Sequence, residues 1–197
     1  MQRLHPPGSQ NGALAALAAA LGFVVVAPKL RATDFYWQSP GGGAFATPAL
    51  RSPFLPIPPN PTLAPGGASD TVNFNLGLSP AARYTVTGVN GQNDRLLVHR
   101  DSLSLNLSGN FALRNTSTNQ PSFTVGLAAG DVGDVLLAGA PGARLETHHA
   151  SIGHAADSAG AVTVDGLEWI GSGSLPTLNI GNSGTGTLTI RNGATVE

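Results

Sequence analysis

The chain has 197 residues, a formal net charge of −1 and 11% charged residues, less than half the share in an average soluble domain, which is roughly 25%. It contains no cysteine and a single lysine, Lys29. This composition excludes disulfide scaffolds, zinc ribbons and domains that bind nucleic acid through a basic surface. The 26 glycines and 15 prolines, with abundant Thr, Ser, Asn, Val and Leu, favour an extended β architecture outside the cytosol over a compact enzyme.

The N-terminal region has the pattern of a targeting segment. Residues 13–27 form a run of 15 residues without a charged or polar side chain, preceded by Arg3. A transmembrane helix needs about 20 such residues, whereas the apolar region of a secretory signal peptide is of this length. We therefore predict a signal peptide over residues 1–32, with its cleavage position left open. An Ala-rich buried helix and an uncleaved anchor are the alternatives.

The next segment, residues 33–69, is rich in proline and glycine. Aromatic residues cluster at 34–37 (DFYW), and six prolines fall between Pro53 and Pro65. Proline lacks the N–H group that a sheet requires, so this composition favours irregular chain or polyproline II. We predict an irregular lead and N-terminal cap here. Tyr36 and Trp37 are expected to pack over the open end of the following domain, with ligand stacking as the alternative.

The remainder of the chain alternates between apolar and polar residues. Residues 70–76 place Val72, Phe74 and Leu76 on one face, as a strand does. Short β-type runs follow at 84–87, 95–98, 103–107 and 111–113, and Gly, Asn, Asp and Ser separate them. Turn residues at this spacing are typical of an all-β fold.

An internal repeat dominates the last 75 residues. Segments that begin at Val125, Ile152 and Ile180 lie 27 and 28 residues apart and share one order of features. Each has an apolar residue, a glycine, a turn, a glycine, an alternating strand and a further glycine. Apolar or small residues alternate in three places per repeat: Phe123/Val125, Ala150/Ile152 and Leu178/Ile180; Val135/Leu137, Val162/Val164 and Leu188/Ile190; Leu145/Thr147, Leu167/Trp169 and Ala194/Val196.

Such a repeat predicts a solenoid in which three short strands close one coil and equivalent strands of successive coils pair in parallel. The inward rows would be Val125/Ile152/Ile180, Val135/Val162/Leu188 and Leu137/Val164/Ile190. Glycines would recur at corners, where the backbone needs positive φ or close approach. A β-sandwich is the competing architecture, but the third repeat is two residues shorter in its first turn, which a solenoid tolerates better. We predict an all-β, right-handed parallel β-helix over residues 70–197, after the signal helix and the irregular lead.

The repeats also resemble a known family. The segments VGLAAGDVGDVLLAG, SIGHAADSAGAVTVDG and IGNSGTGTLTIRNGATV are similar to the repeats of bacterial autotransporter-type passenger proteins and of large surface proteins with C-terminal sorting signals. Residues 34–77 resemble the beginning of such proteins. The resemblance implies a right-handed β-helix stalk, export and an adhesin-like role. Pro141 and Pro176 depart from the family pattern, and we expect them at a corner and just before a strand.

The resemblance leaves the anchoring of the protein open. The sequence ends at Glu197 inside a repeat, so we expect the last coil to be truncated and expect neither an outer-membrane barrel nor an apolar sorting helix within this chain. An uncapped last coil would expose its strand edge. We therefore expect end-to-end self-association at this C-terminal edge, and a membrane connection only through an anchor outside this chain.

Candidate metal and carboxylate sites receive little support from the repeat. His148, His149 and His154 lie near Glu146 and Asp157, but the adjacent repeats offer no further ligands, so we expect exposed corner histidines. Four aspartates fall at different offsets within the repeat and are not expected to stack into a paired-carboxylate site. They are Asp131, Asp134, Asp157 and Asp165.

Two other features are expected to be structural. Gly184 and Gly186 lack the third glycine and the following helix of a phosphate-binding loop, so they are predicted to be corner glycines. Trp169 is predicted to be a core or corner residue, with a sugar-stacking role as the alternative. We therefore predict no catalytic, metal or cofactor-binding residues, no cofactor and no nucleic-acid partner.

These observations predict a secreted or surface-exposed bacterial protein of structural or adhesin-like function. Its β-helix stalk would present a binding surface to a host cell, a matrix or a polysaccharide. A carbohydrate-active β-helix enzyme, a polysaccharide lyase or hydrolase, is the alternative. A second alternative is a non-functional fragment of a larger passenger protein.

Overall fold

The computed structural model of the protein describes residues 34–46, 51–53, 67–78, 82–117 and 119–197. Every regular element in these residues is a β-strand, so the prediction of an all-β fold is confirmed there. The described part of the chain contains no helix that could cross a membrane. The predicted signal peptide over 1–32 and the proline-rich residues 54–66 lie outside the described residues.

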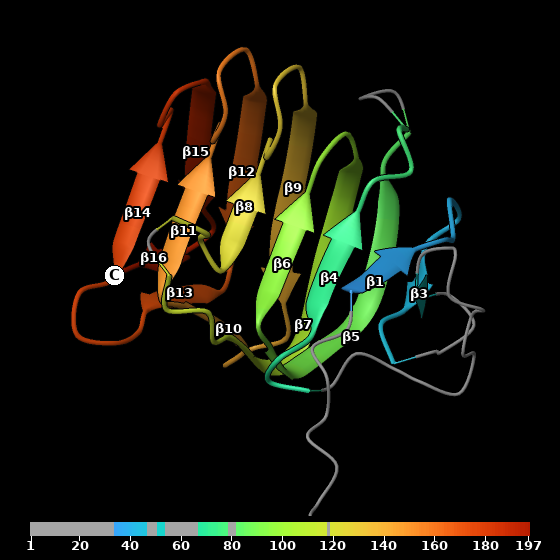
Figure 1. Cartoon of the computed structure of the whole chain (residues 1–197). Helices are drawn as coiled ribbons and strands as arrows, with labels where there is room; N and C mark the ends of the chain where they lie inside the picture. The colour runs from blue at the N-terminus through green and yellow to red at the C-terminus, as the bar shows by residue number, and fades with distance from the viewer. Residues whose placement is uncertain (1–33, 47–50, 54–66, 79–81, 118) are drawn as a thin grey trace, which may run out of the picture.

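One sheet, which we call the first sheet, has seven strands in the order β14-β11-β8-β6-β4-β1-β3. Its pairs are parallel throughout, except that β3 runs antiparallel to β1. Figure 1 shows β4, β6, β8, β11 and β14 side by side. The strands are β1 (Asp34–Trp37), β3 (Arg51–Pro53), β4 (Thr71–Phe74), β6 (Arg95–Val98), β8 (Phe123–Val125), β11 (His149–Ile152) and β14 (Thr177–Ile180).

The second sheet is also parallel, and its strands divide into two series at β7. The first half of β7 pairs with β9 and the second half pairs with β10, so each later repeat contributes two strands to this sheet in place of one long strand. Its strands are β2 (Gly43–Ala44), β5 (Tyr84–Asn93), β7 (Ser102–Leu113), β9 (Val132–Gly139), β10 (Arg144–Thr147), β12 (Ala159–Asp165), β13 (Glu168–Gly171), β15 (Thr185–Arg191) and β16 (Thr195–Val196).

The strand register confirms that the sequence repeat is a structural repeat. Ile152 pairs with Val125 on one side and with Ile180 on the other. In the second sheet, equivalent residues of β9, β12 and β15 pair with one another, so that Val162 lies between Val135 and Leu188. The two-residue difference of the third repeat is absorbed in the turn between β14 and β15. The chain therefore alternates between the two sheets once per repeat and stacks each strand on its equivalent.

Parallel pairing in the first sheet also includes strands that precede the sequence repeat, which begins near Val125. Leu96 pairs with Phe123 and with Val72, and Val72 pairs in turn with Phe35 of β1. The aromatic segment 34–37 is thus a strand of the first sheet. The predicted strands at 84–87, 103–107 and 111–113 are parts of β5 and β7.

The core is a continuous set of apolar rows between the sheets. The predicted rows are buried in the first two repeats, with Val125, Ile152 and Val135 fully inaccessible. At the N-terminal end, the Trp37 ring centroid lies 5.8 Å from that of Phe74 and 6.3 Å from that of Tyr84, and Trp37 is buried as expected. Burial of these rows against their neighbours provides the main stabilisation, because one coil cannot bury its own apolar face.

Glycine at position 153 is required by both its backbone and its surroundings. Its φ is +70°, a left-handed conformation that costs other residues free energy. A Cβ atom there would also overlap the carbonyl oxygen of Thr185 in the next coil. Gly142, in the corner after Pro141, has a φ of +81° but open space around it. The corner role predicted for repeat glycines is confirmed at Gly153.

These two glycines give a matched pair of variants. Gly142→Ala should lower the free energy of unfolding by roughly 1 kcal/mol, the cost of left-handed backbone alone. Gly153→Ala should lower it by more than about 3 kcal/mol, because adjacent coils must also separate. Urea unfolding followed by circular dichroism measures both values. Equal effects of the two substitutions would contradict the close stacking of coils at Gly153.

Candidate functional site

Among the described residues, the outer face of β9, β12 and β15 is a surface on which equivalent positions align from coil to coil. Side chains alternate in and out along these strands, and the outward positions align between coils. We call this surface the threonine face. Its rows are Val132/Ala159/Thr185, Asp134/Ala161/Thr187, Leu136/Thr163/Thr189 and Ala138/Asp165/Arg191. The face therefore presents methyl and hydroxyl groups at the spacing of parallel strands, about 4.8 Å.

Ion pairs lie at two places on the threonine face. Arg83 pairs with Asp134, and its Nη1 donates to the carbonyl oxygen of Leu103 at 3.1 Å. At the other end of the strands, Asp165 accepts hydrogen bonds from Asn192 and from Arg191, at 2.6 Å and 2.8 Å. These two donors hold the pKa of the Asp165 carboxyl below its usual range. The charges on this face are thus paired within the chain.

The strand register places Asp134 and Asp165 in different rows of the threonine face. Asp134 aligns with Ala161 in the next coil, and Asp165 aligns with Ala138. Asp131 aligns with Ser158 at a corner, where the carbonyl oxygen of Asp131 accepts a hydrogen bond from the N–H of Ala159. These three carboxyl groups therefore do not stack on one another between adjacent coils.

Two buried carboxylates accept hydrogen bonds at the corners of the first coils. Asp101 is 1% exposed and accepts hydrogen bonds from the N–H groups of Leu76 and Gly77 and from the hydroxyl of Tyr84, the last at 2.7 Å. Its three donors come from the chain segment of the preceding coil. A carboxylate with these partners stabilises the backbone around it, and loss of one partner would leave a buried group unsatisfied.

Asp131 has the equivalent role one repeat later. It is 2% exposed and lies 3.0 Å from Nδ1 of His99, while Nε of Arg100 donates to it at 3.1 Å. The N–H of Ala128 donates a hydrogen bond to the same carboxylate at 2.8 Å, within one turn of the chain. Sequence analysis identified neither Asp101 nor the His99 contact. A recurring Asp immediately before a strand, at residues 101 and 131, is the signal that could have found them.

The three histidines of the cluster were predicted to be exposed, and none of them is fully exposed in the structure. His149 is 7% exposed, not an exposed corner residue, because it lies within β11 and its Nδ1 is 2.8 Å from the Thr177 hydroxyl of the paired strand. His154 is half-buried, with Nδ1 3.0 Å from the Ser151 hydroxyl. His149 and His154 thus each have a hydroxyl partner of their own, and His148 is half-buried. Within the ranges that the structure describes, no three His, Asp or Glu side chains are placed to hold a metal ion.

Gly184 lies in the corner before β15, as predicted, whereas Gly186 lies within β15 and not at the corner that was predicted for it. A Cβ atom at Gly184 would overlap the backbone and side chain of Ser158 in the preceding coil. One at Gly186 would overlap the backbone at Gly181 and Ile152. The two glycines therefore allow close contact between coils.

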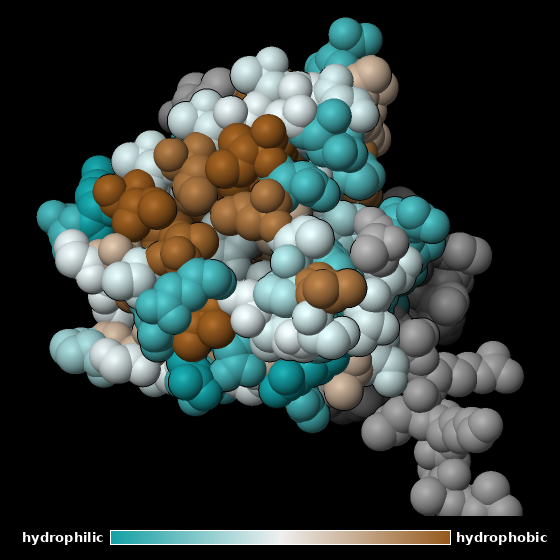
Figure 2. All heavy atoms as spheres, turned by 90° about the vertical axis from the view of Figure 1, so that its left-hand side faces the viewer, coloured by the Kyte–Doolittle hydropathy of each residue, from teal (hydrophilic) through white to brown (hydrophobic). Residues whose placement is uncertain are grey.

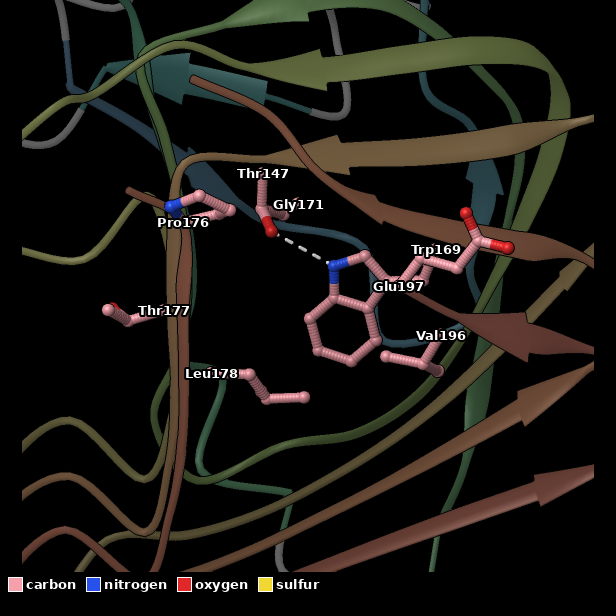
Figure 3. A pocket seen from close by; sticks show the side chains of 8 residues that line it. All are labelled: Thr147, Trp169, Gly171, Pro176, Thr177, Leu178, Val196 and Glu197. Atoms are coloured by element: carbon pink, nitrogen blue, oxygen red, sulfur yellow. Dashed lines mark hydrogen bonds between the residues drawn. The ribbon is translucent and has the colours of Figure 1, made fainter. Parts of the chain in front are cut away.

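Trp169 is a core residue, as predicted. It is 2% exposed, its Nε1 donates to the Thr147 hydroxyl at 2.9 Å, and its ring packs edge-on against Phe123 with centroids 5.4 Å apart. Figure 3 shows the indole beside a cavity of about 260 Å³ that Leu178 and Val196 also line. The ring is therefore the floor of a hollow at the C-terminal end of the stack and not an open sugar-stacking platform.

Comparisons with protein-family models, with curated proteins and with solved structures give no match for this chain.

The Tyr84–Asp101 pair predicts a dependence of stability on pH. Burial and the hydrogen bond to Asp101 raise the pKa of Tyr84 in the folded chain. Because the folded pKa exceeds the unfolded value of about 10, the stabilisation is complete below pH 10 and falls as the pH rises further. Urea unfolding at pH 9 and pH 11 should show a larger loss of stability in the wild type than in Tyr84→Phe. The same loss in both proteins would contradict this role of Tyr84.

Proposed function

We propose that this chain is an exported, adhesin-like structural protein of a bacterial surface. In this proposal it forms a right-handed parallel β-helix stalk that presents the threonine face to a host cell, a matrix or a polysaccharide. The observation that carries the proposal is the parallel, in-register pairing of equivalent strands in both sheets across successive repeats. The preference of parallel crossovers for right-handed winding supports the proposed hand.

Further support comes from the sequence. The apolar run at 13–27 has the length of a signal-peptide core. The repeats resemble those of autotransporter-type passenger proteins, which are exported β-helix stalks. The low charge of 11% suits a protein whose role depends on shape and on an extended surface. No family match accompanies this resemblance, so the proposal depends on the repeat, the leader and the register together.

The threonine face is the binding surface that we propose. Its outward rows contain hydroxyl and methyl groups, and its charged groups are paired with one another. Such a surface offers many weak hydrogen bonds and apolar contacts in a regular array. That chemistry suits an extended ligand such as a polysaccharide chain, in which the same groups also recur at regular intervals. The proposal assigns no catalytic step to this face.

Export can be tested with one substitution in the leader. Leu21→Arg places a charge in the apolar run, which should prevent recognition as a signal peptide and retain the full chain in the cytoplasm of a bacterial host. Cell fractionation with detection of the intact chain measures the outcome. The same change at Leu175, which is 79% exposed, is the control and should leave export unchanged. Export of the Leu21→Arg variant at the wild-type level would refute the assignment of the leader.

Binding can be tested with lysine substitutions in the last coils. Thr163→Lys and Thr187→Lys interrupt the rows of the threonine face and should weaken binding to the recognised polysaccharide or matrix by about tenfold. Thr195→Lys, at an exposed position on β16, is the control on another face. Binding of fluorescently labelled wild-type and variant chains to a panel of insoluble polysaccharides and matrix proteins provides the measurement.

The outcomes distinguish the two functional classes. Equal binding by all variants would place the binding surface elsewhere, and no binding across the panel would contradict the adhesive role. Release of new reducing or unsaturated sugar ends from a polysaccharide would instead establish the alternative, a carbohydrate-active enzyme.

A further inference from the structure

The corner that leads from the second sheet back to the first differs in length between successive coils. β7 ends at Leu113 and β8 begins only at Phe123. Similarly, β13 ends at Gly171 and β14 begins at Thr177. Between β10 and β11, in contrast, the corner is the single residue His148. This short corner therefore lies between two longer ones.

A cavity of about 400 Å³ lies at the short corner, and we call it the histidine cavity. The described residues that line it are Thr116, His148, His149, Ser174, Leu175 and Thr177. They come from the corner itself and from the coils on both sides of it. The cavity is therefore enclosed by chain on two sides. Its volume lies in the range of sites that bind small ligands, roughly 300–1,000 Å³.

His149 is a buried polar group with one ring nitrogen available to a ligand. It is 7% exposed, and its carbonyl oxygen accepts a hydrogen bond from the Ser122 hydroxyl of the preceding coil at 2.9 Å. Its Nδ1 lies 2.8 Å from the Thr177 hydroxyl of the following coil. No described residue forms a hydrogen bond with Nε2. The Thr177 contact thus fixes the ring and leaves Nε2 as the nitrogen that can bind a ligand.

The loop that enters β14 closes over His148. Gly173 in this loop has a φ of +103°, and a Cβ atom there would lie 2.5 Å from Nδ1 of His148. Glycine therefore allows the backbone to approach the imidazole closely. Leu175 of the same loop lines the cavity although it is 79% exposed, so it lies at the opening. Figure 2 shows apolar and polar side chains intermixed on the face of the molecule that includes β14.

The groups in the histidine cavity match the chemistry of a neutral sugar. Neutral imidazole and hydroxyl groups both donate and accept hydrogen bonds, as sugar hydroxyl groups do. Leu175 and the methyl groups of Thr116 and Thr177 offer apolar surface to the C–H groups of a sugar ring. Among the described lining residues there is no Lys, Arg, Asp or Glu that would favour a charged ligand.

We propose that the histidine cavity binds one neutral pyranose unit of a glycan, with Nε2 of His149 hydrogen-bonded to a sugar hydroxyl and Leu175 against the ring. The cavity lies at a corner between the sheets and shares no residue with the rows of the threonine face. The proposal therefore does not rest on the function proposed for that face. It assigns binding to the cavity and no reaction.

Sugar binding can be tested by nuclear magnetic resonance on the purified, ¹⁵N-labelled chain. Glucose, galactose, mannose and N-acetylglucosamine are the probes. At least one should bind with a dissociation constant of roughly 1–10 mM and shift the Nε2 resonance of His149. His149→Phe keeps a planar ring without the nitrogen and should weaken binding at least about tenfold. His154→Phe is the matched control, because His154 contacts Ser151 and does not line the cavity.

A second variant avoids any change in the core. Leu175→Gly removes a largely exposed side chain and should weaken binding of the same sugar about threefold. Thr163→Lys and Thr187→Lys, on the threonine face, should leave it unchanged. Circular dichroism establishes that each variant is folded. No saturable shift with any probe, wild-type affinity in folded His149→Phe or in Leu175→Gly, shifts confined to the threonine face, or tighter binding of glucuronate than of glucose would each overturn the proposal.

Discussion

Parallel pairing between strands one repeat apart is the interaction on which the rest of this structure depends. Side chains alternate with a period of two along a strand, so a shift of one residue would move every apolar row to the outer face. The observed register keeps Val135, Val162 and Leu188 in one inward row and leaves threonines outside. The strand register therefore determines both which side chains form the core and which side chains form the outer face.

The corners explain the unusual composition of the chain. Close contact between coils at Gly153 and at Gly186 requires glycine, while Asp101 and Asp131 satisfy backbone and side-chain donors that the turns bury. Much of the limited charge is consequently used inside the structure or in ion pairs. The threonine face is therefore a regular array of small polar and apolar groups. Such an array suits recognition of an extended ligand better than catalysis at a single active site.

The sequence was most informative where the structure is most regular. Three repeats of nearly equal length made the rows from Val125 to Ile190 predictable, because equal spacing implies equal register. The pairing of the earlier strands could not be predicted, since β7 merges two strands of a later repeat into one. The burial of His149 depends on the hydroxyl of Thr177 in the adjacent strand, and the Tyr84–Asp101 bond also joins different coils. Apart from the Asp that precedes a strand at residues 101 and 131, such contacts between coils leave no local pattern in the sequence.

The central claim, that successive repeats stack in register, can be tested by one distance. Leu136 and Thr189 lie on either side of Thr163 in the same outward row, two strands apart. The chain has no cysteine, so Leu136→Cys combined with Thr189→Cys places spin labels at these positions alone. With excess unlabelled chain, stacked repeats predict backbone positions about 10 Å apart and strong dipolar broadening. Labels more than about 25 Å apart, beyond five strand spacings, would contradict the stacking of the repeats.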